Sequence, residues 1–110
     1  MDARLPQLAE QLLLIERELR VLGWWTMQAP DDQALASQEP FCVDTMAFSE
    51  WLQWVFLPRM KQLLERGAGL PDVSGILPMA EMTYVANMTE VRQLLALLGE
   101  FDLLISGPSA

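Results

Sequence analysis

The chain has 110 residues, of which 52% are hydrophobic and 20% are charged, with a net charge of −8 and no histidine. This length and composition predict a single globular domain with one core, and exclude a disordered chain. An acidic chain without a basic run is poorly suited to grip phosphate backbones, so we do not expect direct nucleic-acid binding. The absence of histidine removes the commonest general base and metal ligand, so the composition indicates neither a metal nor a cofactor.

The cellular compartment follows from cysteine content and hydropathy. The single cysteine, Cys42, cannot form a disulfide within the chain, which fits a reducing environment. No apolar run approaches the ~20 residues that span a bilayer, and the N-terminal residues lack the features of a signal peptide. We therefore expect a cytoplasmic protein without membrane contact.

The N-terminal segment predicts a helix over residues 5–22. Pro6 falls in its first turn, where proline is tolerated, and Gly23 is a suitable stop. Trp24 and Trp25 follow and are expected to fold back over the bundle. The helix is predicted from six apolar residues that alternate spacings of three and four, namely Leu5, Leu8, Leu12, Ile15, Leu19 and Leu22.

Residues 26–40 predict a connection that contains a short helix. Pro30, Asp31 and Asp32 are typical of a helix start, and the helix is expected to run through Leu35. The connection is therefore not expected to be structureless along its whole length.

The most apolar stretch, residues 40–60, predicts the central helix of the domain over residues 45–66. Asp44 is the expected N-cap, and Gly67 the C-terminal stop. Pro58 is expected to kink or break this helix, because it lacks an N–H and its ring crowds the carbonyl of Trp54.

The C-terminal third predicts a surface loop over residues 68–78, which is pinned to the core by Leu70, Val73 and Ile76. Two further helices are expected over residues 79–86 and 88–105. The second of these is expected to start at a capping box formed by Asn87 and Glu90.

No segment alternates like a strand, so we predict an all-α fold. The expected architecture is a compact four-helix bundle, or an irregular helical array, with one or two short extra helices. A single domain over residues 1–107 is expected, followed by a disordered tail at 108–110.

The central stretch resembles the signature of the YqcC-like family, and the resemblance runs across essentially the whole chain. It implies a small all-helical bacterial protein, catalogued as a domain of unknown function and often encoded near a tRNA pseudouridine synthase. No catalytic residues come with it. The matching features are Pro40-Phe41, Asp44-Thr45, Glu50 to Val55, Pro58-Arg59-Met60 and, later, Pro78, Glu81 and Met82.

Cys42 and the acidic side chains are interpreted as structural. Without histidine to activate it, Cys42 is expected to be a small buried hydrophobe rather than a nucleophile. Asp44, Glu50 and Glu81 have no metal-binding spacing. We interpret Asp44 as a helix cap and Glu81 as a partner of a helix dipole.

Arg59 is the charge for which a specific role is predicted. It is expected to be at least half buried and paired with Asp44, Glu50 or Glu81, because a buried guanidinium needs a carboxylate. The alternative is an anion-recognising group in a pocket beside tryptophans. The candidate binding residues are therefore Arg59, Trp51, Trp54, Glu81 and Asp44.

Three functions remain open from the sequence. The first is a non-enzymatic interaction module with a protein partner, alone or as a homodimer, which an exposed patch at Trp54 and Leu57 would favour. The second is a small-molecule or anion-binding protein, which an enclosed polar pocket at Arg59 would favour. The third, implied only by the family resemblance, is an accessory to a tRNA pseudouridine synthase that acts through a protein partner.

Overall fold

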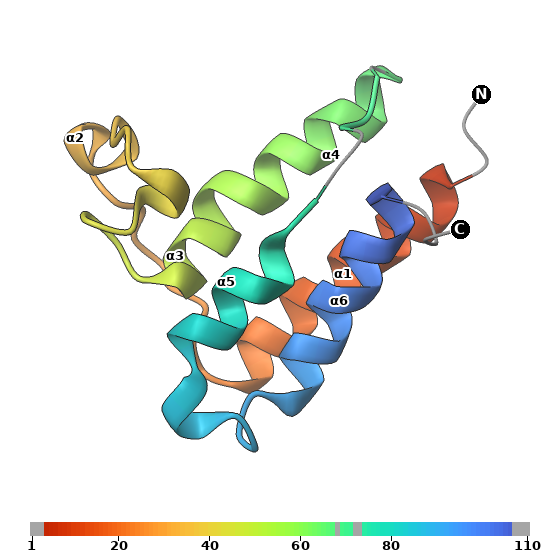
Figure 1. Ribbon diagram of the computed structural model, residues 1–110. Helices are drawn as coiled ribbons and strands as arrows, with labels where there is room; N and C mark the ends of the chain where they lie inside the picture. Colours follow the sequence, from red (N-terminus) through yellow and green to blue (C-terminus); the bar gives the residue numbers. More distant parts are fainter. Residues whose placement is uncertain (1–3, 68, 72–73, 107–110) are drawn as a thin grey trace.

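The computed structural model describes residues 4–67, 69–71 and 74–106, and every regular element within these ranges is helical. The all-α prediction is therefore confirmed. In chain order (Figure 1) the elements are α1 (Leu5–Val21), α2 (Asp32–Leu35), the 3₁₀ helix η1 (Pro40–Cys42), α3 (Phe48–Trp51), the π-helical turn η2 (Leu52–Phe56), α4 (Leu57–Arg66), α5 (Ile76–Thr83), the 3₁₀ helix η3 (Val85–Asn87) and α6 (Arg92–Ser106).

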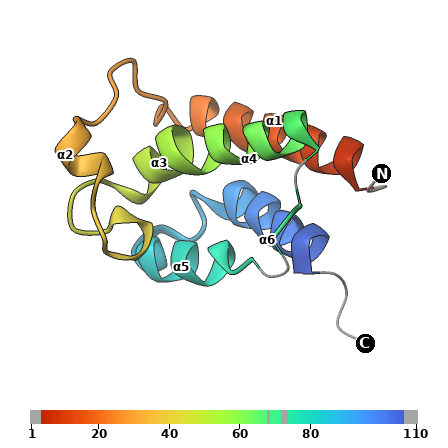
Figure 2. The same cartoon turned by 90° about the horizontal axis from the view of Figure 1, so that it is seen from above.

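The helices form two layers, with α1 and the α3–α4 rod in one layer and α5 and α6 in the other (Figure 2). Helix α1 packs against both α6 and α4, and α5 packs against α6. The core between the layers is apolar, and its fully buried side chains include Leu8, Leu12, Ile15, Leu19, Leu52, Leu57, Val91, Leu94, Leu98 and Phe101.

Helix α1 follows the sequence prediction closely. Its buried face carries the predicted leucine and isoleucine residues from Leu8 to Leu19. Gly23, with a φ of 78°, lets the chain turn back after the helix. Trp24 and Trp25 then pack against the core as predicted, with the Trp24 ring stacked on Tyr84 at 5.1 Å between centroids.

The central helix starts at Phe48, later than predicted, and Asp44 does not cap it. Ala47 is the N-cap residue, and its N–H donates to the carboxylate of Glu50 at 3.0 Å. The N–H groups of Thr45 and Met46 donate to the Cys42 carbonyl, which holds the preceding residues in a turn. Asp44 therefore lies ahead of the helix, where it accepts a hydrogen bond from Ser37 Oγ at 2.5 Å.

The chain does not break at Pro58, because a π-helical turn accommodates the proline and the helix continues into α4. In η2 the N–H of Leu57 donates to the carbonyl of Leu52, five residues back instead of four. This widened turn directly precedes Pro58, the residue that has no N–H to continue the regular pattern. The result is one continuous rod from α3 through α4, as Figure 1 shows.

The predicted helices at 79–86 and 88–105 begin and end elsewhere. Helix α5 starts earlier, at Ile76, because Asp102 on α6 accepts the N–H groups of Ile76 and Leu77 at 3.1 and 2.8 Å. Helix α6 starts later, at Arg92, and Asn87 belongs to η3, so the predicted capping box does not start a helix. Val73 and the tail 108–110 lie outside the described residues.

Candidate functional site

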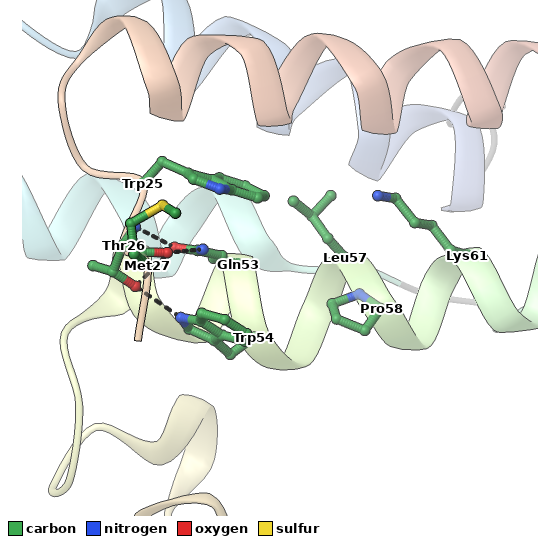
Figure 3. A pocket seen from close by; sticks show the side chains of 8 residues that line it. All are labelled: Trp25, Thr26, Met27, Gln53, Trp54, Leu57, Pro58 and Lys61. Atoms are coloured by element: carbon green, nitrogen blue, oxygen red, sulfur yellow. Dashed lines mark hydrogen bonds between the residues drawn. The ribbon is translucent and has the colours of Figure 1, made fainter. Parts of the chain in front are cut away.

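Two hollows lie on either side of the rod formed by α3, η2 and α4. The first, which we call the Trp54 groove, has a volume of about 420 Å³. Figure 3 shows that its walls come from the chain segment after α1 and from one side of the rod. It is lined by Trp25, Thr26, Met27, Gln53, Trp54, Leu57, Pro58 and Lys61.

Gln53 fixes the two walls of the Trp54 groove to each other. Its side chain is only 5% exposed, and its Nε2 donates to the Thr26 carbonyl at 2.7 Å. Its Oε1 accepts from the Thr26 N–H at 2.9 Å and from Thr26 Oγ1 at 3.2 Å. The side-chain amide thereby pairs with a loop peptide as another backbone segment would, which holds the loop at a set distance from the rod (Figure 3).

Trp54 completes this network, because its Nε1–H donates to Thr26 Oγ1 at 2.9 Å. Among the described residues, no buried side-chain nitrogen or oxygen lacks a hydrogen-bond partner. The surface left facing solvent is mainly apolar, with Met27 92% exposed, Pro58 exposed and Trp54 partly buried. Leu57 is buried and Trp54 is partly buried, so the exposed patch at Trp54 and Leu57 that would favour an interaction module is not present.

Basic side chains at the edge of the Trp54 groove are paired. Lys61 Nζ lies 3.2 Å from Glu16 Oε1, and Arg20 lies 3.2 Å from Glu16 Oε2. Partial burial raises the pKa of Glu16, but the hydrogen bonds from Lys61 and Arg20 outweigh it, so the pKa is lowered overall. The guanidinium of Arg20 also lies 4.3 Å from the centre of the Trp25 ring, a cation–π contact.

The second hollow, the Arg59 cavity, has a volume of about 250 Å³ and is mainly apolar. It contains two of the predicted binding residues, Trp51 and Arg59, whereas Trp54 lines the other hollow. The enclosed polar pocket that would favour a small-molecule or anion-binding protein is therefore not found at Arg59, where the hollow is open and mainly apolar. The lining residues are Phe41, Trp51, Phe56, Arg59, Met60, Pro71, Ser74, Gly75, Ile76, Phe101 and Ile105.

The π turn brings Trp51, Phe56 and Arg59 to the same side of the rod. A regular helix turns by about 100° per residue, so residues five apart lie about 140° from each other. One extra residue in the turn reduces that separation to about 40°. Accordingly, Trp51 stacks on Phe56, five residues later, at 5.7 Å between ring centres. The same shift brings Arg59 to the side of Trp51.

The predicted ion pair of Arg59 is absent. Arg59 is exposed, and within the described part of the chain it pairs with none of the three predicted carboxylates. Asp44 is bonded to Ser37, and Glu50 is bonded to the Ala47 N–H. Glu81 is exposed on α5 and lines neither hollow.

Cys42 is buried, at 7% exposure, and lies in a stretch of unusual backbone that no sequence pattern predicts. Phe41 and Cys42 have φ values of 59° and 49°, in the left-handed region that is unfavourable for residues with side chains. The burial agrees with the interpretation of Cys42 as a structural residue. Its lack of any catalytic role stays a prediction.

Three residues that the sequence analysis did not single out build the Trp54 groove: Thr26, Met27 and Gln53. Thr26 and Met27 belong to a stretch without periodicity, and Gln53 lies in an apolar helix. The hydrogen bonds between Thr26 and Gln53 join residues 27 positions apart, so no local pattern could reveal them.

The described residues contain no cluster of three or more histidine, cysteine or acidic side chains that could hold a metal. No helix in the described ranges is long and apolar enough to cross a bilayer.

Comparison with known proteins places this architecture among small bacterial proteins. The model of the family DUF446, described as tRNA pseudouridine synthase C, matches residues 7–104. An uncharacterized protein from Haemophilus influenzae is 40% identical over 81% of this chain and 83% of its own length. The uncharacterized protein YqcC from Escherichia coli is 35% identical over 87% of this chain and 88% of its own length.

Two further comparisons bear on fold and context. The solution NMR structure of E. coli YqcC superimposes with a TM-score of 0.85 at 31% identity, over 99% of this chain and 93% of that one. A tRNA pseudouridine synthase C from Pectobacterium carotovorum is 48% identical over 69 residues, which are 63% of this chain and only 18% of that protein. The resemblance noted in the sequence is therefore supported by sequence, family model and structure together.

Proposed function

This chain belongs to the YqcC-like family, and we propose that it is a non-enzymatic interaction module that binds a protein partner through the Trp54 groove. The observation that supports this most is the groove itself. Its polar groups are joined to one another, while Met27 and part of Trp54 remain accessible in a concave apolar surface. Aromatic and methionine side chains are favoured in the centres of protein interfaces.

The groove is suited to docking because its shape is set before a partner arrives. The hydrogen bonds between Gln53 and Thr26 hold the loop wall, and the Trp54 indole is fixed by Thr26 Oγ1. Side chains that are already ordered lose little conformational entropy on binding, so more of the contact energy contributes to affinity. The expected contact is an apolar side chain of the partner inserted between Met27 and Trp54.

The partner we propose is a tRNA pseudouridine synthase of the C type. One protein of that name contains a segment 48% identical to 69 residues of this chain, so in that protein a related module forms part of a longer polypeptide. Enzymes that bind tRNA carry basic surfaces that face phosphates. A module with a net charge of −8 is complementary to such surfaces and would be steered toward them.

The proposal predicts saturable binding between the intact chain and the purified synthase C of the same bacterium, measured by isothermal titration calorimetry. Met27→Asp should weaken binding by tenfold or more, because a carboxylate would have to be desolvated in the apolar groove. Met82→Asp is the matched control, since Met82 is 75% exposed and lies outside the groove. It adds the same charge elsewhere and should leave the affinity unchanged.

Several outcomes would overturn the proposal. No saturable binding would exclude the synthase, and equal weakening by both variants would indicate charge alone rather than groove contact. Sedimentation equilibrium of the free chain tests the homodimer alternative, and a dimer that Met27→Asp dissociates would assign the groove to self-association. Binding of tRNA by the chain alone would contradict a role that acts through a protein.

A further inference from the structure

The Arg59 cavity is lined by residues of both helical layers, from the rod, the start of α5 and α6. Helix α4 packs on α1, and α5 packs on α6, so the cavity opens between the rod and the start of α5. The two layers are seen edge-on in Figure 2. Its position is separate from the Trp54 groove, which faces the loop after α1, so the inference goes beyond the proposed docking function.

The interior of the Arg59 cavity has a fixed aromatic wall. Trp51 stacks on Phe56, and Phe56 meets Phe101 edge-on with 4.9 Å between ring centres. Phe56, Phe101 and the opposing Ile76 and Ile105 are all buried. The wall therefore combines side chains from the rod, α5 and α6, and it offers an aromatic or branched aliphatic group a preformed apolar surface.

Arg59 is the one charged residue among those described as lining the cavity. Ser74 also lines it, but its hydroxyl already donates to Asp102 at 2.5 Å. Arg59 forms no hydrogen bond or ion pair among the described residues, whereas Lys61, on the same helix, is paired with Glu16. A guanidinium presents a planar fork of donors that matches a carboxylate in a bidentate geometry.

We propose that the Arg59 cavity binds a small apolar carboxylate. The ring or branched chain of this ligand packs against the aromatic wall, and its carboxylate pairs with Arg59. The volume of about 250 Å³ is below the roughly 300–1,000 Å³ of pockets for drug-sized ligands. The ligand class is therefore a single-ring aryl acid or a short branched acid.

The test is an NMR titration of the intact chain with phenylacetate as the probe, and with the uncharged phenylacetamide as its matched analogue. Phenylacetate should shift the methyl resonances of Ile76 and Ile105 and the indole N–H of Trp51, with a single saturable affinity. Phenylacetamide should bind about tenfold more weakly, because it loses the charge-assisted bond while keeping the ring.

Two variants locate the charge that recognises the probe. Arg59→Gln should weaken phenylacetate binding about tenfold and bring it close to phenylacetamide, since the donor fork is lost. Arg66→Gln removes one positive charge from the same helix outside the cavity and should change neither affinity. Equal binding of acid and amide, unchanged binding by Arg59→Gln, or shifts confined to Trp54 would each overturn the proposal. An absence of saturable shifts at millimolar probe would do the same.

Discussion

The Trp54 groove and the Arg59 cavity flank one helix, and both are mainly apolar, yet they differ in what happens to their polar groups. In the groove, Gln53, Thr26 and Trp54 bond to one another and Lys61 is paired with Glu16. In the cavity, the guanidinium of Arg59 has no partner among the described residues. Polar groups that satisfy each other shape a surface for apolar contact, whereas an unpaired charge beside an apolar wall favours a ligand of opposite charge.

The largest effect should come from removing the amide that holds the groove together. Gln53→Ala leaves the N–H and carbonyl of Thr26 without partners and creates a gap beside the rod, so we expect a loss of about 2–4 kcal/mol in the free energy of unfolding. Gln62→Ala, an exposed control on the same helix, should change it by less than about 0.5 kcal/mol. Urea denaturation measures both, and equal losses would show that the bonds contribute no net stability.

The next effect concerns Tyr84. Its ring stacks on that of Trp24, the residue just before the groove residues Trp25, Thr26 and Met27. Burial raises the pKa of Tyr84 from 10.0 to about 12, so the folded state retains the phenolic proton above the pH at which the unfolded chain releases it. The contribution of Tyr84 to the free energy of unfolding is fully present below pH ~10. It is lost as the pH rises toward about 12, and the loss is at most about 2–3 kcal/mol.

Because Tyr84 is the single tyrosine of the chain, tyrosinate absorbance reports its titration directly. Denaturation midpoints between pH ~9 and ~12, compared with those of Tyr84→Phe, separate this contribution from that of the other groups that titrate in this range. A phenol that titrates near pH ~10 in the folded chain would contradict the burial argument.

On the cavity side, the corresponding structural contact is Asp102, which caps α5 and fixes the residues from Ser74 to Ile76 that line the cavity. Asp102→Ala should cost about 0.5–2 kcal/mol, the range found when a side chain that accepts the first N–H groups of a helix is removed. Glu100→Ala, exposed on the same helix, is the control. If both variants are equally stable in thermal denaturation, the cap does not hold the start of α5.

The smallest effect is expected for Arg59 itself. With an exposed side chain and no partner in the described part of the chain, Arg59→Gln should change the free energy of unfolding by less than about 0.5 kcal/mol. A ligand-binding role and a structural role are thereby separated, since the same variant should weaken carboxylate binding. A decrease of several kcal/mol in the free energy of unfolding would instead support the buried ion pair that the sequence predicted.

The sequence predicts what repeats locally and misses what depends on distant partners. The stripe from Leu8 to Leu19 and the short helix from Asp32 to Leu35 follow from periodicity and capping residues, and both are present. The start of α5 was missed because its cap, Asp102, lies on another helix. The pocket predicted beside both Trp51 and Trp54 is not formed, because the two side chains line different hollows.

The π turn is a second feature that the sequence did not predict. A regular helix would have needed Pro58 to break or kink it, whereas a single widened turn keeps the rod continuous and moves Arg59 to the side of Trp51. The ion pair of Arg59 was predicted on the assumption of burial. Its exposure removes the electrostatic need for a carboxylate.

The most direct test of the proposed separation between the two hollows is the indole N–H region of an NMR spectrum, recorded while the chain is titrated with its proposed synthase partner. Trp54 lines the groove and donates to Thr26, while Trp51 lines the cavity, so the two resonances report the two sides of one helix. We predict that the synthase perturbs the Trp54 resonance and leaves Trp51 unchanged, and that phenylacetate does the reverse. A synthase that perturbs Trp51 and not Trp54, or neither, would contradict the assignment of the groove as the docking surface.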